Sequence, residues 1–246
     1  MIVFHYRPVS DTQVINKVTW ADGSDEEIVI MIAAADNGDI DLGDYWSVGD
    51  ERIVRLGSIT GYSAIRSQSE QDITLVLMNE GYPGTGNERI NFVVGQKGSL
   101  KQACRMNNSD TNTGSWNDCG MRMELNNLYL MALPETLRRG LKYFNVITAQ
   151  TYNGSTNQTS QDYVSLFAEK EFFGSRQYSN STESNALTQI EFFKTATNRS
   201  YSGTWLRSPY YNYNGSFCWV YIEGGTVYQY QKTASSYMNT APFMCI

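Results

Sequence analysis

Two features of this 246-residue sequence predict an α+β fold. Before about residue 200, helical patterns are mixed with short strands of unequal length, whereas the residues that follow have almost entirely the pattern of strands and turns. Such an order, without a regular alternation of strand and helix, is typical of α+β domains. Hydrophobic residues make up 41% of the chain and charged residues 18%, which favours a folded protein over a disordered one.

A lead-in and a capped helix are expected at the N-terminus. Residues 1–23 have an irregular or extended pattern, and Ser24 and Glu27 then have the spacing of a capping box. The acidic residues around Glu27 favour the positive start of a helix, which we expect to span about 25–36 and to end near Asn37-Gly38. We expect residues 1–39 to serve attachment or oligomerisation and residues 40–246 to form one domain.

The middle of the chain is expected to contain both strands and helices. Two short strands are predicted within 40–57, and apolar runs predict buried strands at 73–81 and 89–95, with a loop at 81–88 between them. Ser99 could cap a short helix over 100–108, and Asn117 or Asp118 could cap a longer one over 119–133. Pro134 suits the first position of a further helix. We expect strands at 144–152 and 163–174, and a polar loop at 175–189.

Charge and hydropathy argue against several classes of partner. The net charge is −6 and the pI about 4.9, whereas nucleic acids and anionic membranes both attract basic surfaces. No apolar stretch approaches the roughly 20 residues of a membrane span. The first residues lack the basic start and apolar core of a signal peptide. We therefore expect neither nucleic acid nor membrane as a partner.

Catalytic and metal-binding patterns are weak. The only histidine is His5, and a Ser-His or Cys-His pair would depend on it. The acidic stretch 36–44 does not have the spacing of a calcium-binding EF-hand loop, so a turn is the simpler interpretation. The four cysteines form no CxxC pair and are expected to be buried free thiols. We expect no enzymatic activity, no cofactor and no metal.

Aromatic residues are concentrated near the C-terminus. In the predicted strand 216–224, alternation places Phe217, Trp219 and Tyr221 on one face and the apolar set Cys218, Val220 and Ile222 on the other, which we take as the core face. A hairpin turn at Glu223-Gly224-Gly225 would bring the next strand alongside. An outward row of aromatic side chains, set among Asn, Ser and Gly, has the composition of antibody binding loops. The segment therefore predicts a binding surface.

Five stretches of the chain share motifs with one known group of proteins. They are LGDYWSVGDERIVRL (42–56), INFVVG (90–95), SWNDCGMRMELNN (115–127), TWLRSPYY (204–211) and APFMCI (241–246). Together they resemble C-type-lectin-fold domains found in gut bacteria and in the tail proteins of their phages, related to the variable proteins of diversity-generating retroelements. The resemblance covers roughly 40–246, and its most specific part is WLRSP followed by a hairpin and a closing strand. It implies a C-type-lectin-like fold with short antiparallel strands, two or more helices and a β-rich C-terminal ligand-binding face.

The resemblance also implies a function. In the diversified members, reverse transcription changes adenines near the end of the gene, so that Asn codons become codons for Tyr, Ser, Asp or His. The density of Asn, Tyr and Ser in 210–216 and 235–239 is what such a process would leave. The implied role is recognition of a host-cell surface protein or glycan by a phage tail tip or a bacterial surface adhesin. A homotrimer, or attachment to a larger tail protein, would add avidity.

The expected ligand-binding residues all lie in the last part of the chain. They are Tyr210, Tyr211, Asn212, Tyr213, Asn214, Trp219, Tyr221, Tyr228, Tyr230, Tyr237 and Asn239. The alternative is a structural component of a virion or cell surface, whose Tyr-rich face packs against other subunits. The exposure of Trp219, Tyr221, Tyr228 and Tyr230 distinguishes the two.

Overall fold

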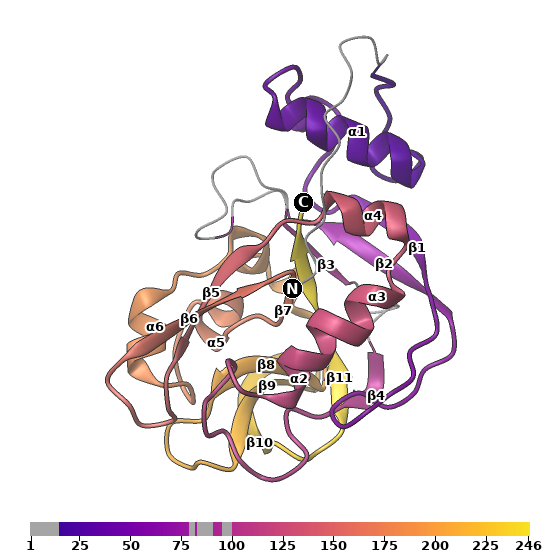
Figure 1. Ribbon diagram of the computed structural model, residues 1–246. Helices are drawn as coiled ribbons and strands as arrows, with labels where there is room; N and C mark the ends of the chain where they lie inside the picture. Colours follow the sequence, from indigo (N-terminus) through magenta and orange to yellow (C-terminus); the bar gives the residue numbers. More distant parts are fainter. Residues whose placement is uncertain (1–14, 79–81, 83–90, 95–99) are drawn as a thin grey trace.

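The structure is a computed structural model that describes residues 15–78, 82, 91–94 and 100–246 (Figure 1). Short helices lie around two five-stranded sheets and a separate two-stranded hairpin. The predicted α+β class is confirmed. The loop predicted at 81–88, apart from Tyr82, and the residues Ser99 and His5 lie outside the described residues.

The first sheet includes the last strand of the chain. Its strands, in order across the sheet, are β1 (Glu51–Leu56), β2 (Gln71–Leu77), β3 (Asn91–Val94), β12 (Phe243–Cys245) and β7 (Val164–Ser165). β12 runs antiparallel to both neighbours, with Phe243 opposite Val93 on one side and Ser165 on the other. The apolar C-terminal strand is thus an interior strand, which explains why its residues are buried.

The second sheet carries the aromatic segment. Its strands, in order, are β10 (Thr226–Thr233), β9 (Ser216–Glu223), β8 (Thr204–Pro209), β11 (Met238–Thr240) and β4 (Leu100–Cys104). β8, β9 and β10 form antiparallel pairs, and β11 lies parallel to β8. The remaining hairpin pairs β5 (Phe144–Ala149) with β6 (Asn157–Asp162).

The N-terminal helix α1 (Asp25–Asp36) forms as predicted. Ser24 and Glu27 make both bonds of the capping box, and Asn37 is the C-cap. Ile28 and Met31 belong to the same hydrophobic core as the sheets. The helix is therefore anchored by burial as well as by its cap.

One longer helical segment runs from near β9 toward α4 in Figure 1. It consists of α2 (Gly120–Glu124), a π-helical turn η3 (Leu125–Tyr129) and α3 (Leu130–Ala132). The predicted helix is confirmed, but its predicted caps, Asn117 and Asp118, are wrong. The N-cap is Cys119, whose Sγ accepts the backbone N–H of Arg122 at 3.3 Å.

Two predictions for the earlier part of the chain are wrong. Residues 100–104 form β4 and not a helix, because they pair with β11 and bury Leu100, Ala103 and Cys104. Tertiary pairing overrides a helical propensity that is weak over so short a segment. Within 40–57 only β1 is a strand, and Leu42–Asp44 form the 3-10 helix η1, capped by Asp41.

Two predictions for the middle of the chain also fail. The predicted strand at 163–174 contains only the two-residue strand β7, followed by α5 (Glu169–Phe173). The predicted polar loop at 175–189 contains α6 (Ser181–Ala186), whose N-cap Asn180 accepts from the N–H of Thr182 at 2.7 Å. Three further short helices are α4 (Glu135–Gly140), η4 (Glu191–Lys194) and η5 (Ala196–Arg199). The helix predicted after residue 133 is confirmed as α4, but Pro134 is its N-cap and not its first residue.

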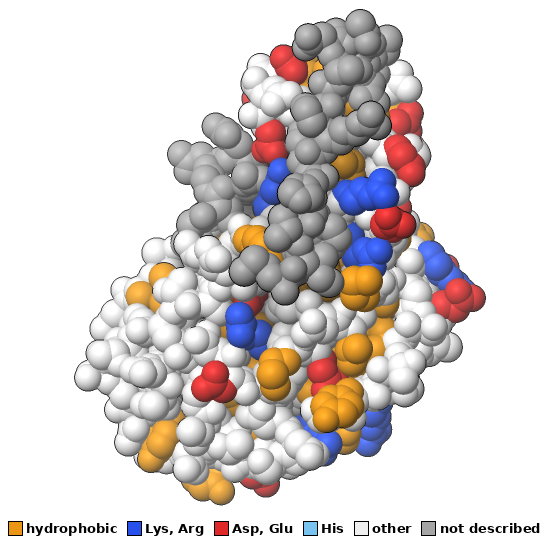
Figure 2. Space-filling view, in the orientation of Figure 1, with side chains coloured by type: hydrophobic (Ala, Val, Ile, Leu, Met, Phe, Trp, Pro, Cys, Tyr) orange, Lys and Arg blue, Asp and Glu red, His pale blue; other side chains and the backbone are white. Residues whose placement is uncertain are grey.

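The surface over β5, β6 and α6 is mainly backbone and uncharged polar side chains, as Figure 2 shows on the left of the molecule. This agrees with the many Asn, Ser and Thr residues of those segments. None of the described helices is long and apolar enough to span a bilayer.

Candidate ligand-binding surface

The hairpin of β9 and β10 determines which aromatic side chains share a face. Tyr228 lies opposite Tyr221, and Tyr230 lies opposite Trp219. Gly224 and Gly225 between the strands have positive φ angles of 56° and 82°, as a tight two-residue hairpin turn requires. The turn therefore sets a register that gathers four aromatic side chains on one side.

These four rings continue into a longer series, which we call the aromatic row. The row consists of Tyr211, Tyr210, Tyr178, Tyr230, Trp219, Tyr221 and Tyr228, in spatial order. Neighbouring ring centroids lie between 5.5 Å, for Tyr210 and Tyr211, and 6.5 Å, for Tyr221 and Tyr228. These separations are typical of favourable aromatic pairs.

The row is open to solvent at several points. Relative exposure is 42% for Tyr211, 46% for Tyr228 and 48% for Tyr230, and 52% for the nearby Tyr213. Trp219 and Tyr221 are half-buried between them. The aromatic side chains therefore form a supported surface that the described part of the chain leaves open to solvent.

The predicted division of β9 into two faces holds only in part. Cys218 and Val220 are fully buried, as expected. Phe217, predicted to face outward, is also fully buried, because the first half of β9 is covered on both sides. Ile222, predicted as core, is only half-buried, because the strand leaves the core near the turn.

A buried asparagine holds the loop 210–215 at the end of the row. The side-chain amide of Asn112 donates to the carbonyl oxygens of Tyr213 at 3.1 Å and Ser216 at 2.7 Å. Asn212 and Asn214, two predicted binding residues, lie exposed in this loop beside Tyr213. Asn112 was not predicted from the sequence, because nothing in its polar neighbourhood marks it as buried.

Tyr178, which lies between Tyr210 and Tyr230 in the row, was also not predicted, because it belongs to the segment predicted as a polar loop. Its backbone and those of its two neighbours are held by the buried carboxylate of Glu169, which accepts the N–H groups of Gln177, Tyr178 and Ser179 at 2.8–3.1 Å. Burial, together with Tyr230 and Tyr210, raises the pKa of Tyr178. The phenol is therefore neutral at physiological pH and can donate a hydrogen bond.

A buried charge cluster lies at β8. The guanidinium of Arg207 contacts both carboxylate oxygens of Glu171, at 2.6 and 2.7 Å, and Tyr82 donates to the same carboxylate at 2.6 Å. Burial would lower the pKa of Arg207, but Glu171, Tyr82 and Glu183 together outweigh it, and the pKa is raised. Such a bidentate pair fixes geometry as well as charge.

Glu183 of α6 is the second carboxyl of this cluster. It accepts from the hydroxyl of Ser208, next to Arg207, and from the N–H of Ala149 at 3.1 Å. Burial raises the pKa of Glu183 to about 7, although Arg207 acts in the opposite direction. These acids support the sheet from inside and are not accessible to a ligand at the row.

Two predicted binding residues lie apart from the row. Tyr237 packs beneath two cations, with the guanidinium carbon of Arg66 3.7 Å and that of Arg105 5.0 Å from its ring centroid. Asn239 belongs to β11, which β8 separates from β9. The structure therefore brings together Tyr210, Tyr211, Trp219, Tyr221, Tyr228 and Tyr230, and leaves Tyr237 and Asn239 elsewhere.

The described cysteines are free and buried, as predicted. Burial raises the pKa of Cys104 and of Cys119 to about 12. Thiols with such pKa values are poor nucleophiles at neutral pH. Among the described residues, no group of three or more His, Cys, Asp or Glu side chains is placed to hold a metal ion.

Comparison with protein families shows a match over the C-terminal part of the chain. The family model described as "Domain of unknown function (DUF6273)" matches residues 89–246, which is more than half of the chain and includes both the aromatic row and the buried charge cluster around Arg207, apart from Tyr82. Neither a curated protein nor a solved structure matches the chain.

Proposed function

The chain belongs to the DUF6273 family, and we propose from its surface that it is a ligand-recognition protein that binds through the aromatic row. The observation that carries this proposal is the row itself: a continuous series of rings, exposed at Tyr211, Tyr228 and Tyr230, on a hairpin whose β9 strand packs into the core. Exposed apolar surface of this kind is costly unless a partner covers it.

The chemistry of the row suits a glycan or a protein surface. Tyr and Trp offer large contact areas with few rotatable bonds and carry one polar group each. The loop residues Asn212 and Asn214 add adaptable hydrogen-bonding groups beside the rings. We propose a host-cell surface protein or glycan as the ligand, and a phage tail tip or a bacterial cell surface as the location.

We further propose that the fold is C-type-lectin-like and that the C-terminal segment is diversified by a retroelement. The positions of two of the motifs that carry the resemblance support the fold proposal. In the WLRSP motif, Arg207 is fully buried and paired with Glu171, so the motif has a structural role. The closing strand β12 is an interior strand of the first sheet. A rigid scaffold of this kind would tolerate changes at the exposed Tyr and Asn positions.

The proposal treats the chain as a binding protein without catalysis and without a cofactor. The three carboxyl groups beneath the row and the sheet that carries it, Glu169, Glu171 and Glu183, are buried and bonded to backbone, serine or arginine partners. They are therefore not available to a ligand as general acids or bases.

The first prediction tests the row directly. The double variant Tyr228→Ala/Tyr230→Ala should lose most of its binding, at least about tenfold, because both rings are exposed anchors of the row. Binding would be measured on a glycan array and on a display library of cell-surface proteins. Tyr62→Ala is the matched control, since Tyr62 is 89% exposed and makes no ring contact with another described residue. Undiminished binding by the double variant would place recognition elsewhere.

The alternative function is that of a structural component whose tyrosines pack against other subunits. A homotrimer is compatible with both the recognition function and the structural function. Sedimentation analysis of the same double variant separates them. If Tyr228→Ala/Tyr230→Ala dissociates an oligomer that the wild-type chain forms, the row is a subunit interface. If the oligomeric state is unchanged while ligand binding is lost, the row is a recognition surface.

A further inference from the structure

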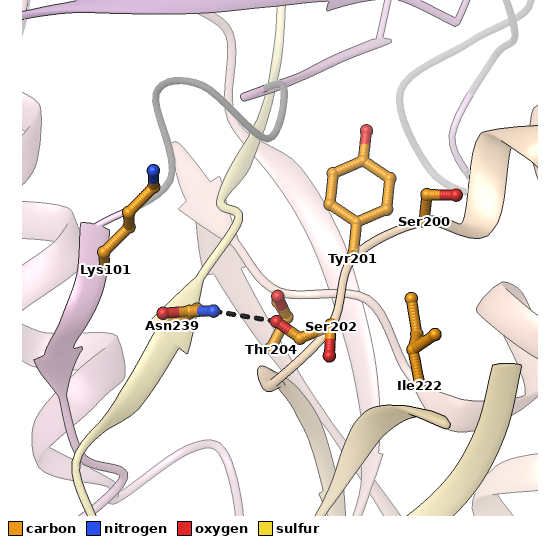
Figure 3. A pocket seen from close by; sticks show the side chains of 7 residues that line it. All are labelled: Lys101, Ser200, Tyr201, Ser202, Thr204, Ile222 and Asn239. Atoms are coloured by element: carbon orange, nitrogen blue, oxygen red, sulfur yellow. Dashed lines mark hydrogen bonds between the residues drawn. The ribbon is translucent and has the colours of Figure 1, made fainter. Parts of the chain in front are cut away.

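A pocket of about 330 Å³ is lined by residues of strands β4, β8, β9 and β11 and of the segment before β8 (Figure 3). Ile222 lines it, and because side chains alternate along a strand, Ile222 points away from the face that carries Tyr221 and the aromatic row. Its volume is at the lower end of the range of small-molecule sites, about 300–1,000 Å³. The pocket is therefore separate from the aromatic row and could hold one small molecule.

One wall of the pocket is held rigidly by Asn239. Its side-chain Nδ2 donates to the carbonyl oxygen of Ser202 at 2.7 Å, the bond drawn in Figure 3, and its Oδ1 accepts the N–H of Gln102 at 2.9 Å. Its backbone N–H donates to Gly203 at 2.9 Å. This asparagine ties β4 and β11 to the segment before β8, so the pocket is formed before any ligand arrives.

Several polar groups at the pocket have unused bonding capacity. The hydroxyls of Ser200, Ser202 and Thr204 make no hydrogen bond to another described side chain or backbone group, and the ammonium of Lys101 makes neither a hydrogen bond nor an ion pair within the described chain. Figure 3 shows Lys101 on the side of the pocket opposite Ser200. A cation at one side and hydroxyls at the other form a pattern that an anionic, hydroxylated molecule would satisfy.

The charges around the pocket favour an anion at Lys101. Among the described residues, no carboxylate side chain lines the pocket. Burial, and to a smaller extent the charge of Glu51 in β1, raises the pKa of Tyr201. The Tyr201 phenol therefore stays neutral and adds no negative charge to the pocket.

We propose that this pocket binds an acidic monosaccharide, either free or as the terminal unit of a glycan. Its carboxylate would lie at Lys101, its hydroxyls would bond to Ser200, Ser202 and Thr204, and Ile222 would contact its C–H groups. This site is independent of recognition by the aromatic row, because Asn239 and the other lining residues lie outside the row.

Glucuronate is the probe, and glucose is the neutral control of the same size and ring. Chemical-shift titration of the ¹⁵N-labelled chain should show glucuronate binding at least about tenfold tighter than glucose, with shifts at residues 200–204 and 239. Lys101→Met should weaken glucuronate binding by about tenfold or more. Lys232→Met is the matched control, because Lys232 carries the same charge on the exposed face of β10, and it should bind as the wild type does.

Tyr228→Ala/Tyr230→Ala should also bind glucuronate as the wild type does, which separates this site from the aromatic row. Equal affinity for glucose and glucuronate, or unchanged affinity of Lys101→Met, would overturn the proposal. A disaccharide that ends in glucuronate identifies the source: tighter binding than the free acid indicates a glycan terminus, and weaker binding indicates a free acid.

Discussion

Three buried glutamates illustrate how the same residue type acquires different roles. Glu169 accepts backbone N–H groups, Glu171 pairs with Arg207, and Glu183 accepts from one hydroxyl and one backbone N–H. Glu183 has the fewest compensating contacts, and its pKa rises from an ordinary 4.5 to about 7 through burial. Its charged form is therefore the costly state in the folded protein.

This gives a prediction for the pH dependence of stability. Because the folded state binds the proton more tightly than the unfolded state, the stabilisation by Glu183 is complete below pH 4.5 and is lost as pH rises to about 7. Between pH 5 and pH 8 the loss should be about 2–3 kcal/mol. Glu183→Gln, which stays neutral, should lack this component in urea unfolding at the two pH values.

Glu70→Gln is the matched control, because the side chain of Glu70 is 65% exposed in its ion pair with Arg55. It should keep the wild-type pH dependence. If Glu183→Gln instead changes with pH as the wild type does, the titrating group lies elsewhere in the chain.

At the scale of elements, α5 and the segment after it form a support for the aromatic row. The carboxylate of Glu169, in the first turn of α5, satisfies three successive N–H groups at 177–179 and so holds Tyr178 between Tyr210 and Tyr230. The support is therefore a backbone segment bound by one side chain, and not a strand or a long helix.

Glu169→Gln tests this support. The amide of Gln has no charge and replaces one accepting oxygen by a donor, whereas the N–H of Tyr178 contacts both carboxylate oxygens. The bonds to the three N–H groups should therefore weaken, at a cost of about 1–3 kcal/mol. Hydrogen exchange of the amides at 177–179 should become faster, and ligand binding at the row should weaken. The exposed Glu70→Gln variant should change neither, and unchanged exchange at 177–179 in Glu169→Gln would contradict the assigned role.

At the scale of the whole molecule, the described N-terminal segment is packed into the main core. Trp20 is fully buried and makes an edge-to-face contact with Trp46, with ring centroids 5.4 Å apart. Its indole N–H donates to the carbonyl oxygen of Leu75 in β2. Arg52 of β1 adds a hydrogen bond to the carbonyl oxygen of Trp20 at 3.2 Å. The segment and the first sheet should therefore unfold together.

Trp20→Ala should lower the free energy of unfolding by about 3–5 kcal/mol, because a large core side chain is removed. Urea unfolding, followed by hydrogen exchange at β2, measures whether the sheet is affected. Tyr62→Ala, at an exposed position, should be within about 0.5 kcal/mol of the wild type. If β2 keeps its protection in Trp20→Ala, the N-terminal segment is an independent unit.

Features set by neighbouring residues could be predicted from the sequence. The capping box of Ser24 and Glu27 acts over three residues, and the Gly224-Gly225 turn sets the register of β9 and β10. The gathering of Trp219, Tyr221, Tyr228 and Tyr230 on one face follows from that register and from strand alternation. These outcomes depend on local geometry, which the order of residues determines.

Only the tertiary structure decided what depends on distant partners. Residues 100–104 became a strand because β11 lies beside them, and Phe217 is buried because the sheet is covered on both sides at that point. Tyr178 lies in the aromatic row because Glu169 accepts a hydrogen bond from its backbone N–H. Asn239 forms a wall of the pocket because its side-chain amide is hydrogen-bonded to Ser202 and Gln102. The sequence by itself determined which side chains could form a binding face. The long-range contacts determined how that face is supported, because burial and hydrogen bonding across the fold outweigh local preference wherever the two differ.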